Sequence, residues 1–135
     1  MKKNILNVIV AALLCALLFS CSPGQAGEDA VLRVIENQTG RSGGIDVTLT
    51  AHGEDGLDSW HVEASGGKVR LEATSPTAAC YAFNEYLQAA CGGMVTWSGR
   101  NLPLGDHWPD WTSEGKSPFM LRNFLNVCTF GYTAP

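Results

Sequence analysis

The chain has 135 residues, with 9 Lys and Arg against 13 Asp and Glu, a formal net charge of −4 and 45% hydrophobic residues. The charges are scattered and no basic stretch occurs, which excludes the electrostatic footprint of a nucleic-acid-binding protein, and we expect no nucleic acid among its partners. The length fits one ordinary domain.

The first twenty residues carry the pattern of an export signal. Lys2 and Lys3 precede the run 5–19, in which Asn7 is the only polar residue. As a helix this run would span about 22 Å, whereas the hydrocarbon core of a bilayer is about 30 Å thick. The run is therefore typical of a signal peptide, here residues 1–20, and too short for a comfortable transmembrane span.

Cys21 ends a segment, Leu18-Phe19-Ser20-Cys21, that resembles the lipobox of bacterial lipoproteins. We expect cleavage after Ser20, a lipid on Cys21 as the membrane partner, and a flexible tether over 21–27. No aspartate follows the cysteine, so we expect export and anchoring to the outer membrane of the cell envelope. The alternative is an ordinary secretory signal in which Cys21 is incidental.

Apolar spacing then predicts one helix and three strands. Residues 28–37 carry apolar positions at helical spacing, whereas 45–51, 60–64 and 68–72 alternate as half-buried strands do. Gly66-Gly67 is a hairpin turn signal. The three strands are expected to form an antiparallel meander.

A second helix is predicted over 77–90, with Ser75 as its cap and Pro76 at its first position. Short strands are expected at 95–97 and 101–104, and a polar loop at 106–116. The pattern indicates an α+β fold, in which a small, mainly antiparallel sheet is packed by two helices.

The cysteines and histidines indicate neither a disulfide within this region nor a metal site. Cys80 and Cys91 flank the second helix about 16 Å apart, whereas disulfide Cα atoms lie about 4.4–6.8 Å apart. No CxxC occurs, and His52, His61 and His107 sit in no ligand spacing. We therefore expect no metal and no cofactor.

The segment from Asp106 to Trp111 is the most tempting place for chemistry, because it sets Trp108 and Trp111 beside two aspartates. Aromatic rings with carboxylates suit a sugar site, and Asp106 and Asp110 could form a glycosidase pair. The favoured reading is a solvated loop whose tryptophans pack on the sheet, because nothing in it desolvates the acids.

Asn126-Val127-Cys128-Thr129 ends an apolar run of the chain. On its own, a thiol in such a run is expected to be a core residue.

Three segments together resemble known glycosidases. The strand, turn and helix of 69–87 are similar to the domain that precedes the catalytic barrel in hexosaminidase-type enzymes. Residues 91–99, with Trp-Ser-Gly, and 122–132, with Asn-Val-Cys-Thr, resemble the alpha-N-acetylglucosaminidase family of glycoside hydrolases. These enzymes remove terminal alpha-linked N-acetylglucosamine, and the resemblance covers about residues 28–135.

The resemblance implies an N-terminal accessory domain over 28–117, followed by the start of a (β/α)8 barrel at 118–135. Asn126 and Cys128 would lie on the first barrel strand and contact the substrate, while the family's catalytic glutamates lie on later strands. Such a barrel takes about 250 residues. The expectation is therefore a fragment without catalytic residues, inactive alone, whose glycan partner binds to the missing barrel.

A second hypothesis also fits the sequence. The chain would be a self-standing surface lipoprotein that binds a glycan or a partner protein, with Trp108 and Trp111 as its platform.

Overall fold

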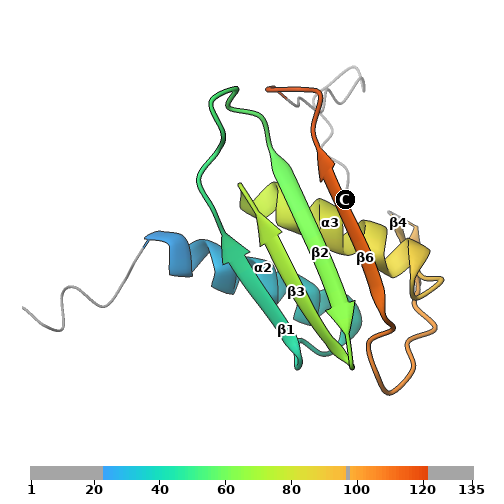
Figure 1. Ribbon diagram of the computed structural model, residues 1–135. Coiled ribbons are helices and arrows are strands. Elements are labelled where there is room, and N and C mark those ends of the chain that lie inside the picture. Colours follow the sequence, from blue (N-terminus) through green and yellow to red (C-terminus); the bar gives the residue numbers. More distant parts are fainter. Residues whose placement is uncertain (1–22, 97, 122–135) are drawn as a thin grey trace, which may run out of the picture.

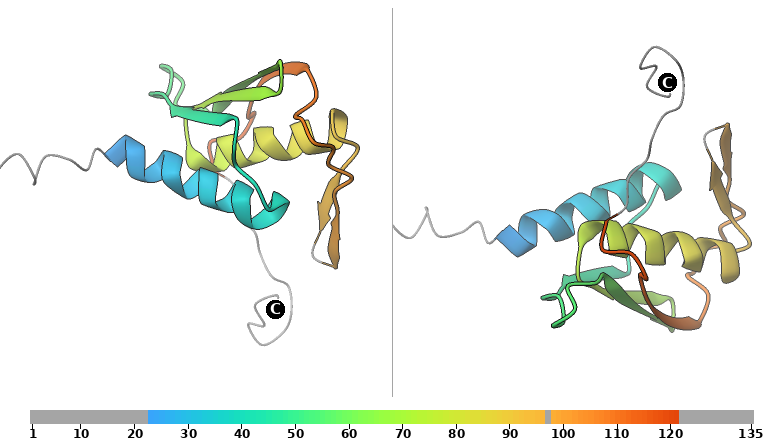
Figure 2. Two further views of the ribbon diagram at one scale, coloured as in Figure 1. Left: turned by 90° about the horizontal axis from the view of Figure 1, so that it is seen from below. Right: turned by 90° about the horizontal axis from the view of Figure 1, so that it is seen from above.

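The computed structural model describes residues 23–96 and 98–121, which form a four-stranded sheet with two helices on one face and a separate two-stranded sheet (Figures 1 and 2). In chain order the elements are α2 (Pro23–Thr39), β1 (Ile45–Leu49), β2 (Ser59–Ser65), β3 (Lys68–Ala73), α3 (Pro76–Ala89), β4 (Met94–Thr96), β5 (Gly99–Asn101) and β6 (Trp111–Lys116). The predicted α+β class with two helices is confirmed.

The sheet has the order β1-β3-β2-β6 and is mixed. β1 runs parallel to β3, while β2 runs antiparallel to both β3 and β6. The predicted meander is wrong, because residues 50–58 pass β3 on the way from β1 to β2, so that β3 lies between these two strands and pairs with both. The sheet was expected to be mainly antiparallel, but it is mixed.

The β2–β3 hairpin follows the predicted turn. Gly66 and Gly67 both have positive φ, 59° and 77°, and Ser65 pairs with Lys68 across them. Two positive φ values define a type I′ turn, whose twist matches that of the flanking strands. The two glycines therefore set the register that buries Val69 and sends Lys68 outward.

β6 lies where a polar loop was predicted. Its inward positions include Ser113 and Gly115, so its sequence lacks the apolar alternation that marks a half-buried strand. Gly115 pairs with Trp60 of β2, and a Cβ at Gly115 would lie 2.4 Å from the indole Cζ2. The tryptophan of the neighbouring strand thus fills the space that a larger side chain on β6 would use.

α2 is longer than the predicted helix, whereas α3 begins where the sequence predicts. α2 begins at Pro23, so that residues 23–27, which were expected to belong to a flexible tether, are helical. α3 begins as predicted: the Ser75 side chain accepts a hydrogen bond from the Ala78 N–H at 3.1 Å, and Pro76 follows the cap. This start satisfies a helix donor that would otherwise lack a partner.

The core lies between the helices and the inner face of the sheet. Its largest side chains with almost no exposure are Tyr86, Ile35, Leu71, Val31, Val62 and Val69. The β4–β5 hairpin forms a separate two-stranded sheet and extends past the helix layer, away from the four-stranded sheet (Figure 2).

Candidate functional site

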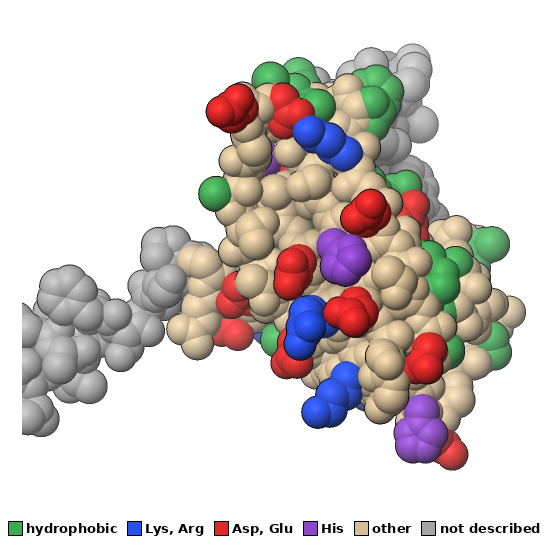
Figure 3. Space-filling model, viewed as in Figure 1, with side chains coloured by type: hydrophobic (Ala, Val, Ile, Leu, Met, Phe, Trp, Pro, Cys, Tyr) green, Lys and Arg blue, Asp and Glu red, His purple; other side chains and the backbone are tan. Residues whose placement is uncertain are grey.

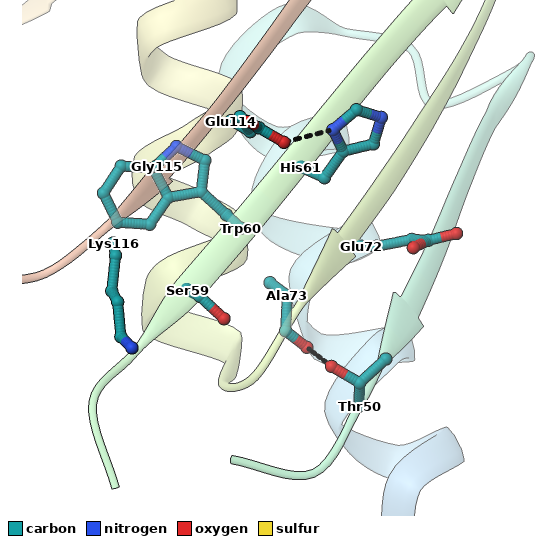
Figure 4. A pocket seen from close by; sticks show the side chains of 9 residues that line it. All are labelled: Thr50, Ser59, Trp60, His61, Glu72, Ala73, Glu114, Gly115 and Lys116. Carbon is teal, nitrogen blue, oxygen red and sulfur yellow. Dashed lines mark hydrogen bonds and ion pairs between the residues drawn. The ribbon is translucent and has the colours of Figure 1, made fainter. Parts of the chain in front are cut away.

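The outer face of the sheet, which no helix covers, carries a hollow. Its volume is about 490 Å³, and it lies across β2, β3 and β6 (Figure 4). The residues that line it are Thr50, Ser59, Trp60, His61, Glu72, Ala73, Glu114, Gly115 and Lys116. Acidic, basic and histidine side chains are spread over this face (Figure 3).

His61 stands between two carboxylates in this hollow. The strand register places it opposite Glu72 of β3 and opposite Glu114 of β6. Its Nδ1 lies 3.9 Å from Glu114 Oε2, and the two side chains are 40% and 85% exposed. Three strands thus bring an acid, an imidazole and a second acid into one row.

This row has the groups but not the surroundings of an acid–base site. A glycosidase acid works near neutral pH because burial in an apolar pocket raises its pKa, whereas Glu72 and Glu114 are exposed. Within residues 23–96 and 98–121, no group of three His, Cys, Asp or Glu side chains is placed to hold a metal ion. The row is therefore a solvated polar surface and not an acid–base site.

The loop before β6 holds Trp108 inside the core. Its ring is 4% exposed, and its Nε1 donates a hydrogen bond to the Gly43 carbonyl at 2.9 Å. The Arg41 guanidinium lies 4.3 Å from the ring centroid and donates to the Asp106 carbonyl at 3.1 Å. A ring enclosed in this way has no face free for a sugar, so Trp108 is not part of a binding platform.

Trp111 and Asp110 also have structural roles. Trp111 is half-buried and packs against Tyr86, with 5.8 Å between ring centroids. Asp110 Oδ1 accepts a hydrogen bond from the Gly66 N–H at 2.9 Å, which ties the loop to the β2–β3 turn. The predicted solvated loop with tryptophans packed on the sheet is right only in part. Both tryptophans do pack against the protein, but they meet the rings of Phe83 and Tyr86 on α3, and Trp111 begins strand β6.

The two described cysteines are free thiols. Burial raises the pKa of both the Cys80 and the Cys91 thiol. Burial likewise raises the pKa of the Tyr86 phenol, and the neighbouring Cys91 adds to this shift. Tyr86 donates its hydroxyl to the Pro109 carbonyl at 2.8 Å. None of these groups is poised to lose its proton near neutral pH, so none is an activated nucleophile.

The residues predicted to bind substrate or lipid lie outside the described part of the chain. These are Asn126 and Cys128 at one end and Cys21 at the other. The sequence did not predict the row of Glu72, His61 and Glu114 on the outer sheet face. Alternation in β2 and β3 sends His61 and Glu72 outward, but Glu114 stood in a segment predicted as a loop.

The chain matches a known family over most of its length. The family of the alpha-N-acetylglucosaminidase (NAGLU) N-terminal domain matches residues 25–110. A human alpha-N-acetylglucosaminidase is 29% identical over 93% of this chain, and the chain spans only 19% of that protein's length.

Two similar solved structures are from Clostridium perfringens. CpGH89, in complex with its substrate GlcNAc-alpha-1,4-galactose, has a TM-score of 0.66 at 20% identity, covering 73% of this chain and 12% of that one. A family 89 glycoside hydrolase in complex with PUGNAc has a TM-score of 0.64 at 20% identity, covering 70% and 11%. At this identity the likeness shows the fold alone.

No helix in the described part of the chain is long and apolar enough to cross a membrane.

Proposed function

The chain belongs to the family of alpha-N-acetylglucosaminidase N-terminal domains, and we propose on this ground that it is the accessory domain of an exported glycoside hydrolase. The whole enzyme would hydrolyse terminal alpha-linked N-acetylglucosamine from glycans. The observation that carries the proposal is the family match over residues 25–110. The human relative, which is much longer than this chain, supports the activity of the whole enzyme.

We infer that this chain alone has no hydrolase activity. Retaining hydrolysis needs two carboxyl groups about 5–5.5 Å apart, one of them with a raised pKa. The acids of the outer sheet face are exposed, and Asp110 is engaged by the Gly66 N–H. The buried acid, Asp58, has its Oδ1 bonded to His52 and Thr74, and neither it nor the acids named above forms such a pair.

The substrate contacts belong to the following domain in this proposal. Residues 118–135 would begin a (β/α)8 barrel, with Asn126 and Cys128 on its first strand facing the sugar. The support is the Asn-Val-Cys-Thr motif, which resembles the family pattern. A glycan would then bind to the barrel, beyond the accessory domain.

An aryl alpha-N-acetylglucosaminide tests the activity directly. The purified 135-residue chain should release no phenol above the rate of a heat-denatured control. Turnover by this chain alone would contradict its proposed inactivity. The DNA that follows codon 135 tests the domain order, because a reading frame that continues into a barrel sequence is the expected result.

Membrane attachment through Cys21 is the second part of the proposal. It rests on the signal pattern of residues 1–21. Cells that express the chain should incorporate labelled palmitate into it, and Cys21→Ser should abolish the label while Cys91→Ser leaves it. The labelled chain should fractionate with the outer membrane. Equal labelling of the Cys21→Ser chain would overturn this attachment.

A further inference from the structure

The start of α2 leaves little chain between the proposed lipid site and the folded domain. α2 begins at Pro23, and Ser22 is the one residue that separates it from Cys21. The Cα atoms of Cys21 and Pro23 lie at most about 7 Å apart, because an extended chain spans about 3.6 Å per residue. Most of the segment that was expected to be a flexible tether is therefore helix.

Gly27 and Glu28 fix the first turns of α2 to the rest of the fold. A Cβ at Gly27 would lie 2.6 Å from Leu49 Cδ1 at the end of β1 and 3.5 Å from Pro76 Cγ at the start of α3, so the helix packs closely there. Glu28 Oε1 accepts a hydrogen bond from the Leu49 N–H at 2.9 Å, and Val31, one turn further on, is 1% exposed. The helix is thus held in place from Gly27 onward.

This arrangement limits how far the domain can lie from its lipid. Along a helix, Pro23 and Gly27 are about 6 Å apart, so Gly27 lies within about 13 Å of Cys21. A fully extended tether over residues 21–27 would reach about 21 Å and would let the domain turn freely. The helical start of α2 shortens this reach, and it gives the attachment a direction because the same helix continues into the core.

The first turn of α2 is compatible with a lipid surface. Gly24, Gln25 and Ala26 are exposed, and no charged residue occurs from Ser22 to Gly27. Small and neutral side chains allow a close approach to headgroups, whereas acidic ones would be repelled by anionic lipids. The β4–β5 hairpin lies at the opposite end of the domain from the start of α2 (Figure 2).

We propose that the start of α2 is the membrane-facing end of this domain, held at the bilayer surface by the lipid on Cys21, and that the β4–β5 hairpin points away from the bilayer. This inference rests on the lipidation of Cys21 in the proposed function and adds an orientation to it. The partner is the headgroup layer of the anchoring membrane. The domain stays within about 13 Å of its lipid and does not swing at the end of a flexible linker.

Energy transfer to the bilayer measures this orientation. A genetically encoded fluorescent amino acid replaces Gln25 in one variant and Asn37 in another, because both side chains are exposed on α2. The lipidated chains are inserted into preformed vesicles of phosphatidylethanolamine and phosphatidylglycerol whose headgroups carry an acceptor. Transfer should be about twofold or more stronger from position 25, because the two positions are about 18 Å apart along the helix. Ala26, which is also exposed, replaces Gln25 as the probe site if that variant is not lipidated.

A flexible spacer provides the matched control. About twenty Gly and Ser residues inserted between Ser22 and Pro23 have an end-to-end distance of about 25 Å, which exceeds the separation of the two probes. The difference between positions 25 and 37 should then largely disappear, while the thermal midpoint stays that of the native chain. Equal transfer from the two positions without the spacer, or an unchanged ratio with it, would overturn the membrane-facing end.

The outcomes separate this inference from the proposed function. A chain that takes up no labelled palmitate contradicts the lipid attachment, and the membrane-facing end is then wrong as well. A chain that takes up palmitate at Cys21 but transfers energy equally from both positions contradicts the orientation alone. Hydrolysis by the isolated chain would contradict its proposed inactivity and leave the orientation untouched.

Discussion

Replacing Trp108 by alanine distinguishes a core ring from a sugar-binding ring. The ring is 4% exposed, and its centroid lies 5.9 Å from that of Phe83 and 6.2 Å from that of Tyr86. Truncation of a buried aromatic ring costs about 3–5 kcal/mol, because the surrounding side chains close the cavity only in part. We therefore expect Trp108→Ala to lower the free energy of unfolding by about that amount.

The melting temperature converts this energy into a measurable shift. In a domain of 60–100 residues, about 1 kcal/mol moves the midpoint by about 4–8 °C, so a fall of about 12 °C or more is expected. The assay is urea and thermal unfolding of the purified chain, followed by far-UV circular dichroism. Trp108→Phe keeps an aromatic ring but loses the hydrogen bond to the Gly43 carbonyl, and should cost about 1–2 kcal/mol.

Trp111→Ala is the matched control. Trp111 is half-buried and meets the single ring of Tyr86 among the described aromatic contacts, so its loss should cost less than that of Trp108. Wild-type stability in Trp108→Ala, within about 0.5 kcal/mol, would refute the core assignment. Loss of glycan binding with unchanged stability would restore the platform hypothesis.

Three further changes test other parts of the fold. Gly115→Ala should destabilise the chain by about 1–3 kcal/mol, because its Cβ would lie 2.4 Å from Trp60 Cζ2. The control, Gly43→Ala, places its Cβ in open space and should change the stability by no more than about 0.5 kcal/mol. Equal urea midpoints for the two variants would contradict the contact with Trp60. Ser75→Ala should cost about 1 kcal/mol through the lost helix cap, and an unchanged midpoint would argue against it. Arg100→Ala should speed amide exchange in residues 94–101 with little effect on the global midpoint; unaltered exchange would show that the hairpin is held elsewhere.

The sequence predicts those parts of the fold that a few neighbouring residues determine. Gly66-Gly67 dictates the hairpin turn because both positions need positive φ. Ser75 and Pro76 mark the start of α3 because the first turn of a helix needs a cap and tolerates a residue without an N–H. These signals depend on neighbouring residues only, and the structure has the turn and the helix start where they predict them.

Contacts between distant segments decide the rest. The parallel pairing of β1 with β3 depends on how residues 50–58 cross the sheet, which no local pattern encodes. β6 is a strand because it meets the free edge of β2, although Ser113 and Gly115 on its inner side resemble a loop in sequence.

The candidate site shows the same division. Strand alternation places His61 and Glu72 on one face, but the row becomes visible only when β6 brings Glu114 to the other side of the histidine. The aromatic and acidic segment before β6 has residue types that suit a sugar site, but the structure gives it another role. Its Trp108 is buried in the core, where the ring contacts Arg41 and donates a hydrogen bond to the Gly43 carbonyl.

Under the proposed function, the described domain would contribute to the enzyme through its fold and not through its chemistry. Its acids on the outer sheet face are exposed, the buried Asp58 is bonded to His52 and Thr74, and its two described thiols have raised pKa values. What distinguishes one side of the molecule is apolar surface, from Val34 on α2 to Leu121 at the exit of the chain.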